Sequence, residues 1–245
     1  YIFNFTNLNK NQKKTPHFIY LKIMSTHFNL LLNSTSPRRL EILSKIISLI
    51  DSKIIIEIIK PTFEEDLNKS DFDTSKDYLL ENTKRKCCGS VIEKATFQFT
   101  DGKPIIIVSA DTILTNSNYS KVLEKPDNAK HNYDMIVEQV EDSCVICMTS
   151  VQVTVIKDGV VLEKHQTLSE AKIVLDKSLL EKRNDKIDLI QQYVNSGEGL
   201  DAAGGFKIQE TGSFMVEKID GDFYTVVGLP FNSTMMTLIE VINKL

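Results

Sequence analysis

Polar side chains suited to binding an anion follow residues 28–34, a short apolar run that predicts a strand. Ser36 before Pro37 is a standard helix start, so Arg38 and Arg39 fall in the first helical turn. Free backbone N–H groups and the positive end of the helix dipole favour an anion at that place. Two positively charged arginines at this end of the helix are unfavourable unless a bound anion compensates for their charge. The pattern indicates a phosphate site, and a simple cap with solvated arginines is the alternative.

A carboxylate suited to catalysis, Asp111, comes soon after the continuous apolar run of residues 105–108. At the end of a buried strand it would accept a proton from water or bind a metal. An isolated Asp at such a place is more often a turn former. Lys125 lies just before a proline that starts another expected helix, and residues 64–65 are an acidic pair that also fits a solvated charge cluster. Each of these signals is weak alone.

Strands and helices alternate along most of the chain, which predicts an α/β fold with parallel and antiparallel pairing. The strands are expected at residues 28–34, 53–59, 104–110, 144–156, 160–167, 171–176, 213–219 and 223–228. The helices are expected from Pro37, at 75–96, at 126–141, as two short helices around 178–196, and after Pro230. Residues 157–159 are a hairpin signal. No repeat or Gly/Ser linker divides this pattern, so residues 25–245 are expected to form one continuous, two-lobed domain.

Composition excludes several classes of protein. The 245 residues are 42% hydrophobic and 25% charged, the balance of a globular protein, and the formal net charge of -4 excludes a globally basic nucleic-acid binder. No run approaches the roughly 18 apolar residues of a membrane span. Cys144 and Cys147 form a CxxC, but they lie in an expected strand whose side chains alternate faces. Buried free thiols in a reducing, cytoplasmic compartment are therefore expected.

The first 24 residues differ from the rest. They begin with Tyr1, contain lysines but no acidic residue, and end at the first methionine, Met24. Because they lack the Arg and Ser of a transit peptide, we expect a disordered or non-native extension.

Six motifs, in order, give the chain a resemblance to a known family. They are LNSTSPRRLEIL (32–43), YLLENTKRKC (78–87), SADT (109–112), VLEKP (122–126), LDAAGGFKIQ (200–209) and GDFYTVVGLP (221–230). Together they resemble the Maf family of nucleotide pyrophosphatases, also called septum-formation proteins. One such motif is weak evidence, but six in this order are highly specific.

The resemblance implies a fold and a reaction. The fold would be an elongated mixed sheet with flanking helices and two lobes around a central cleft, shared with inosine-triphosphate pyrophosphatases. The reaction would be hydrolysis between the α- and β-phosphates of a nucleoside triphosphate, with a divalent metal cation, Mg²⁺ or Mn²⁺, as cofactor. A small-molecule nucleotide is the implied substrate, a homodimer the implied assembly, and neither nucleic acid nor membrane an expected partner.

The resemblance also implies roles for individual residues. Asp111 would activate water, and Lys86 and Lys125 would neutralise charge on the leaving group. The triphosphate would be held by Ser34, Arg38 and Arg39. Glu65 and Asp111 would hold the metal, because hard oxygen ligands suit Mg²⁺ or Mn²⁺.

Three positions distinguish branches of the family. Arg38, Thr112 and Gln209 match the dTTP/UTP branch, in which Thr112 and Gln209 would help to choose the base. The branch that prefers 7-methyl-GTP has an aromatic residue, Gln and Glu at these places. The chain departs from the family at Ala202, where the pattern has Lys, and at Lys207, where it has Gly.

Two further rivals differ in what they do with a nucleotide. One is a non-catalytic nucleotide-binding regulator of cell division, which the presence of Asp111, Lys86 and Lys125 disfavours. The other is a phosphohydrolase that removes a terminal phosphate. The products distinguish these readings, because only the expected reaction releases pyrophosphate.

Overall fold

The computed structural model describes residues 27–63, 67–181 and 187–245. The predicted extension at residues 1–24 and the predicted metal ligand Glu65 lie outside them. The described residues form one mixed sheet in the order β2-β1-β3-β5-β6-β7, with β4 paired to β3. The strands are β1 Asn29–Asn33, β2 Ile56–Ile59, β3 Ile105–Asn116, β4 Val122–Leu123, β5 Cys144–Lys157, β6 Val160–Leu175 and β7 Val216–Gly221.

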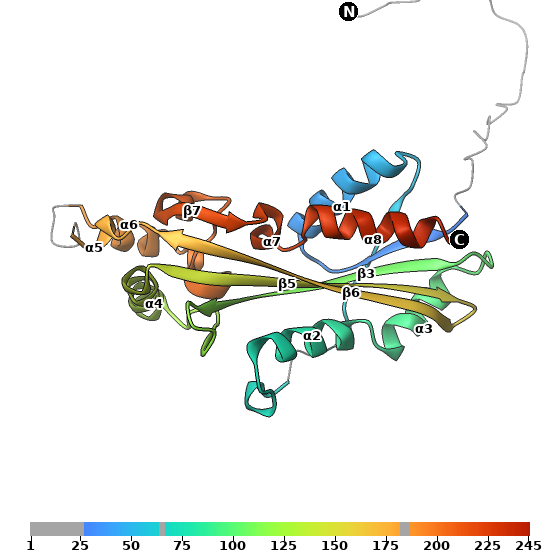
Figure 1. Cartoon of the computed structure of the whole chain (residues 1–245), viewed down its shortest axis with the longest axis horizontal. Coiled ribbons are helices and arrows are strands. Elements are labelled where there is room, and N and C mark those ends of the chain that lie inside the picture. The colour runs from blue at the N-terminus through green and yellow to red at the C-terminus, as the bar shows by residue number, and fades with distance from the viewer. Residues whose placement is uncertain (1–26, 64–66, 182–186) are drawn as a thin grey trace, which may run out of the picture.

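The molecule is elongated along its three longest strands, β3, β5 and β6 (Figure 1). Strand β1 is parallel to β2 and β3, whereas β3, β5, β6 and β7 pair antiparallel in turn. All residues of β5 except the last are buried. Other parts of the molecule therefore cover both faces of this central strand, which explains why its sequence is largely apolar.

Helices cover both faces of the sheet near β1. They are α1 Pro37–Ile50 and α8 Phe231–Ile242 on one face, and α2 Ser75–Lys86 and α3 Gly89–Gln98 on the other (Figure 1). The remaining helices are α4 Ala129–Asp142, α5 Ser178–Glu181, α6 Leu189–Ser196 and the short α7 Phe223–Val227. The mixed sheet with flanking helices confirms the predicted fold class.

The core is divided between the two ends of the molecule. At one end, α1 and α8 pack on β1, β3 and β5 in a cluster that includes Leu43, Val108 and Leu238. At the other, α4 and α6 pack around the far ends of β3, β5 and β6, with Ile136 and Tyr193 among the buried residues. We refer to the ends of the molecule around these two clusters as its two lobes.

Several boundaries differ from the predictions. The helix expected at 75–96 is two helices, because the chain leaves helical geometry at Cys87 and restarts with Gly89. The strands expected at 160–167 and 171–176 are one strand, β6. The strand expected at 53–59 begins only at Ile56. The segment FYTVV, although β-branched and aromatic, is the helix α7, started by the Asp222 side chain, which accepts from two backbone N–H groups.

The thiols behave as expected. All four cysteines are free, and Cys87, Cys144 and Cys147 are buried. Burial raises the pKa of the Cys147 thiol to about 12, so it is not a reactive thiolate at neutral pH. Within the described ranges, no helix has both the length and the apolar character needed to span a membrane.

Candidate active site

The candidate site lies at a gap in the pairing of β3. On the edge that faces β1, that strand pairs with Ile105–Ser109 and the short β4 pairs with Leu114 and Thr115. Residues 110–113 have no strand partner on this edge among the described residues. Side chains alternate between the faces of a strand, so Asp111 and Thr112 point to opposite sides at the gap. A cavity of about 320 Å³ here is lined by both residues.

This position corrects one sequence expectation. Asp111 does not lie in a turn where a strand ends, because β3 continues to Asn116 and Asp111 pairs with Ser150 of β5. The end of the neighbouring strand β1 creates the site, since Asn33 is its last residue and lies opposite Ser109. Because β3 continues where its neighbour β1 ends, the Asp111 carboxylate lines the cavity from a rigid strand.

The turn from β1 to α1 has the predicted capping geometry. The Ser36 side chain accepts from the backbone N–H of Arg39, and Pro37 occupies the first helical position. The buried Ser34 hydroxyl accepts from the backbone N–H of Ser36, at 3.1 Å. Ser34 therefore shapes the turn and does not line the cavity, whereas Ser36 and Arg38 do.

The two adjacent arginines have different surroundings. Arg38 is exposed at the mouth of the cavity. Arg39 is half-buried, and its Nε donates to the carbonyl of Gly228 at 2.9 Å and its guanidinium to the Thr112 hydroxyl at 3.2 Å. The Thr112 hydroxyl also lies 2.9 Å from that of Thr149. Arg39 and Thr112 are thus parts of one hydrogen-bonded group.

A buried ion pair occupies the opposite side of the gap. Lys86 Nζ donates to Asp111 Oδ1 at 2.6 Å, and both side chains are buried. The amide of Asn82 donates to the other carboxylate oxygen, Oδ2. Lys86 is the last residue of α2, and Asn82 lies one turn earlier on the same face. Both oxygens of the carboxylate are therefore held by donors from a single helix.

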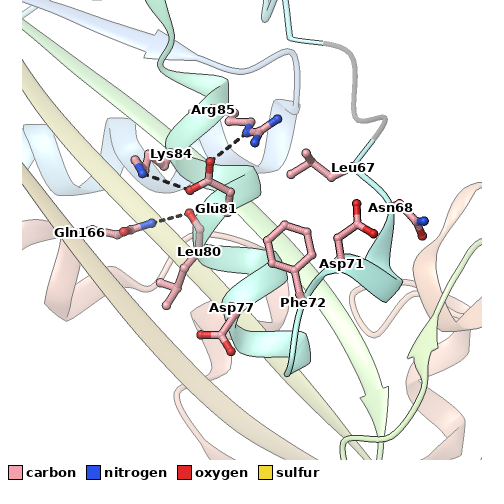
Figure 2. A pocket seen from close by; sticks show the side chains of 10 residues that line it. All are labelled: Leu67, Asn68, Asp71, Phe72, Asp77, Leu80, Glu81, Lys84, Arg85 and Gln166. Atoms are coloured by element: carbon pink, nitrogen blue, oxygen red, sulfur yellow. Dashed lines mark hydrogen bonds and ion pairs between the residues drawn. The ribbon is translucent and has the colours of Figure 1, made fainter.

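The neighbouring lysine of α2 points elsewhere. Lys84 pairs with Glu81 at 3.1 Å, and Glu81 also binds Arg85, on the outer surface of the helix (Figure 2). These residues line a separate open hollow that shares no lining residue with the cavity at Asp111. Of Lys84 and Lys86, only Lys86 lines the cavity at Asp111.

A buried asparagine fixes the backbone beside the ion pair. The Asn33 amide donates to the carbonyl of Lys86 at 2.7 Å and to the Ser109 hydroxyl at 3.1 Å. It joins the end of β1 to the end of α2 and to β3. An amide can make these two contacts and a small apolar side chain cannot.

The loop at residues 200–209 closes the cavity from the other lobe. The N–H of Gly204 donates to the Glu124 carbonyl at 3.0 Å, and the Gly204 carbonyl accepts from Gln139 at 2.7 Å. At Gly205 the backbone has a φ of +76°, and a β-carbon there would lie 2.2 Å from an oxygen of Asn132. Glycine is required here because α4 packs directly on the loop.

Two charged side chains from this loop enter the cavity. Lys207 Nζ lies 2.8 Å from Asp201 Oδ1, and the lysine side chain is only 17% exposed. The Asp201 carboxylate raises the pKa of Lys207, and that lysine lowers the pKa of Asp201, so both are charged at neutral pH. Gln209 is exposed at the rim, and Lys125 is exposed after β4.

The cavity therefore brings together most of the predicted site. Arg38, Arg39, Lys86, Asp111, Thr112, Lys125 and Gln209 all line it. The sequence reasoning missed Asn82, Asp201 and the apolar wall formed by Leu114, Ile173, Phe206, Ile208 and Val226. Asn82 had a readable signal, its spacing of four residues from Lys86, whereas Ile173 lies on the distant β6 and had none.

The charges of the lining indicate what it can bind. Five basic side chains line the cavity and two acidic ones, Asp111 and Asp201. This excess of positive charge suits a polyanion, and the apolar wall suits a flat, uncharged group. A phosphorylated molecule with one aromatic end matches both properties.

The Asp111 carboxylate lines the cavity in a position to bind a divalent metal beside a phosphate. The described residues contain no group of three His, Cys, Asp or Glu side chains able to hold a metal ion. Asp111 nevertheless supplies a hard oxygen donor in the cavity. Mg²⁺ is commonly bound by one or two carboxylates, with phosphate oxygens and water as the other ligands, and this arrangement fits Asp111.

Comparison with known proteins gives consistent matches. A family model described as "Maf-like protein" matches residues 29–241. A protein of Saccharomyces cerevisiae named "dTTP/UTP pyrophosphatase" is 31% identical over 89% of this chain and 92% of its own length. One of the same name from Schizosaccharomyces pombe is 33% identical over 88% and 84%.

A solved structure was also matched. It is that of a HAM1 protein from Coxiella burnetii, at 14% identity and a TM-score of 0.39, covering 87% of this chain and 99% of that one. A similarity at this level carries no conclusion about substrate.

Proposed function

The chain belongs to the Maf-like protein family and is a nucleoside triphosphate pyrophosphatase, and we propose that its substrates are dTTP and UTP. The relatives from both yeasts are named for these two nucleotides, and each covers most of the chain. The products would be the nucleoside monophosphate and pyrophosphate. A homodimer stays a prediction.

The observation that carries the mechanism is the Lys86–Asp111 pair at the gap in β3. Asp111 is fixed on a rigid strand, and its Oδ1 lies 2.6 Å from Nζ of Lys86. We assign Asp111 the role of proton acceptor from the attacking water. Oxygen from that water bonds to the α-phosphorus while the bond from this phosphorus to the bridging oxygen breaks, which releases pyrophosphate.

The basic side chains would bind the triphosphate around this carboxylate. Arg38 and Lys207 line the cavity from opposite lobes, and Lys125 lies beside the loop that carries Lys207. Charge that develops on the leaving pyrophosphate would be stabilised by Lys86 and Lys125. When bound, Mg²⁺ or Mn²⁺ would neutralise phosphate charge and lower the pKa of a bound water, with Asp111 and the predicted Glu65 as protein ligands.

The base would occupy the apolar wall around Phe206. Gln209, at the rim, can donate and accept at once, which suits the carbonyls and the N3–H of uracil and thymine. Thr112 would act differently, because its hydroxyl is bound to Arg39. We assign Thr112 to holding Arg39 and Gln209 to reading the base.

A panel of nucleotides tests this proposal. Purified protein is incubated with Mg²⁺ and dTTP, UTP, dCTP, ATP, GTP or 7-methyl-GTP, and pyrophosphate and orthophosphate are measured separately. We expect pyrophosphate from dTTP and UTP at the highest kcat/KM. A preference for 7-methyl-GTP or a purine would refute the assignment of substrate, and orthophosphate release would refute the site of cleavage.

A further inference from the structure

The carboxylate of Asp111 is held by two donors of different kinds. Lys86 supplies a charge, whereas Asn82 supplies a neutral amide that is 1% exposed and lies on the turn of α2 before Lys86. Asn82 is not among the residues that line the cavity. A bound nucleotide in that cavity would therefore meet Asp111 and not Asn82.

In the part of the chain that the structure describes, the Asn82 amide makes no other hydrogen bond. Its nitrogen donates to Asp111 Oδ2, and its buried oxygen has no hydrogen-bond partner among the described residues. An asparagine at a buried helical position costs stability, because its amide loses its hydrogen bonds to water and the amide oxygen gains no partner in return. A leucine of similar size would fit a helix interior better. The local conflict indicates that this side chain is needed for its contact with Asp111.

The helix that carries Asn82 is itself fixed. The Gln166 side chain of β6 donates to the carbonyl of Leu80 at 2.8 Å, two residues before Asn82 (Figure 2). At the other end of α2, Asn33 holds the carbonyl of Lys86. These contacts from β6 and β1 hold α2, and with it the Asn82 amide, in place.

We propose that Asn82 is a positioning residue, which fixes the orientation of the Asp111 carboxylate about its side-chain bond so that Oδ1 and Oδ2 keep their directions. Lys86 alone, with a flexible chain and a rotatable ammonium, leaves that orientation loose. A second donor on the other oxygen defines the plane of the carboxylate. This inference rests on the proposed role of Asp111 as the proton acceptor.

The test compares two neighbouring buried polar residues of α2. Asn82→Leu removes the donor with little change of size. Thr83→Val is the matched control, because Thr83 is also fully buried and its hydroxyl, among the described residues, donates to the carbonyl of Leu79 in its own helix and not to Asp111. We expect Asn82→Leu to lower kcat for dTTP by about 10- to 100-fold with KM within about twofold, as for a misplaced catalytic group. Thr83→Val should leave both constants near normal.

A double-mutant cycle separates positioning from general loss of structure. In an Asp111→Ala background, the amide has no carboxylate to orient, so adding Asn82→Leu should leave the residual rate unchanged. If Asn82→Leu does not fold, Asn82→Ala is used in its place, with thermal unfolding measured on every variant.

Each result decides between distinct claims. If kcat of the folded Asn82 variant is normal, or if its effect is the same in both backgrounds, Asn82 has only a structural role. If instead Asp111→Ala itself keeps the wild-type kcat, the proposed role of Asp111 fails first. The two failures are therefore distinguishable.

Discussion

At the residue scale, the same side-chain type has different roles at adjacent positions. Arg38 is exposed beside the cavity, whereas Arg39 binds the Gly228 carbonyl and the Thr112 hydroxyl. An arginine in the first helical turn opposes the helix dipole, and only Arg39 has these contacts to compensate for it. Substitution of each arginine should therefore have a different effect on stability.

We predict that Arg38→Ala leaves the melting temperature unchanged or slightly higher and raises KM for dTTP about tenfold or more, because a charge-assisted phosphate contact is lost. Arg39→Ala should raise KM as well and, unlike Arg38→Ala, should lower the free energy of unfolding by about 1–3 kcal/mol. Thermal unfolding without ligand and steady-state kinetics measure both. A clear loss of stability in Arg38→Ala would favour the reading of that arginine as a structural residue.

Lys207 gives a second prediction at this scale. Its ammonium lies in the cavity and keeps its charge beside Asp201. Lys207→Ala should raise KM for dTTP several-fold with little change in stability, because the ion pair is largely exposed on its Asp201 side. The control is Lys218→Ala, which removes an exposed lysine of β7 that also pairs with an aspartate. Equal KM values in the two variants would remove Lys207 from the substrate site.

At the element scale, the turn between α7 and α8 supports the site from a distance. Gly228 ends α7 with a φ of +116°, a backbone conformation that residues with a side chain rarely adopt. Its carbonyl accepts a hydrogen bond from Nε of Arg39. A β-carbon there would lie 3.5 Å from the Thr112 hydroxyl oxygen and 3.6 Å from Arg39 Nε. The space is adequate, so the backbone conformation is what requires glycine.

We predict that Gly228→Ala lowers the free energy of unfolding by about 1–3 kcal/mol and raises KM for dTTP, because the turn shifts and Arg39 loses its anchor. Gly102→Ala is the control: its φ is +72°, and nothing lies within 4 Å of its added β-carbon. This second change should cost about 1 kcal/mol with KM unaltered. A normal KM in Gly228→Ala would separate this turn from substrate binding.

Local sequence signals explain some of these elements and not others. The cap at Ser36 and the start at Pro37 were readable because capping depends on adjacent residues. The position of Asp111 within β3 was not, because the length of β3 is set by its pairing with β5 at twelve positions, and β5 follows much later in the sequence. The helix α7 was missed for the opposite reason, since its cap at Asp222 outweighs the β preference of five residues.

At the scale of the whole molecule, the site depends on both lobes. Asp111, Lys86 and Arg38 come from the lobe of α1 and α2, whereas Lys207 and Gln209 come from the loop packed on α4. The order of motifs in the sequence indicated that these segments act together. Their meeting at the gap beside β3 follows from the strand order, in which β1 ends and β4 begins on the same edge.

The most direct test of the whole account is pyrophosphate release from dTTP by Asp111→Asn, with dTTP affinity measured on the same preparation. Asparagine keeps the size of the side chain but cannot accept the proton from water. We predict a folded protein whose kcat falls by about 100- to 10,000-fold while dTTP binds as tightly as before or more tightly, since a negative charge facing the phosphates is gone. Near-normal turnover would contradict the account, because Asp111 would then not be the proton acceptor.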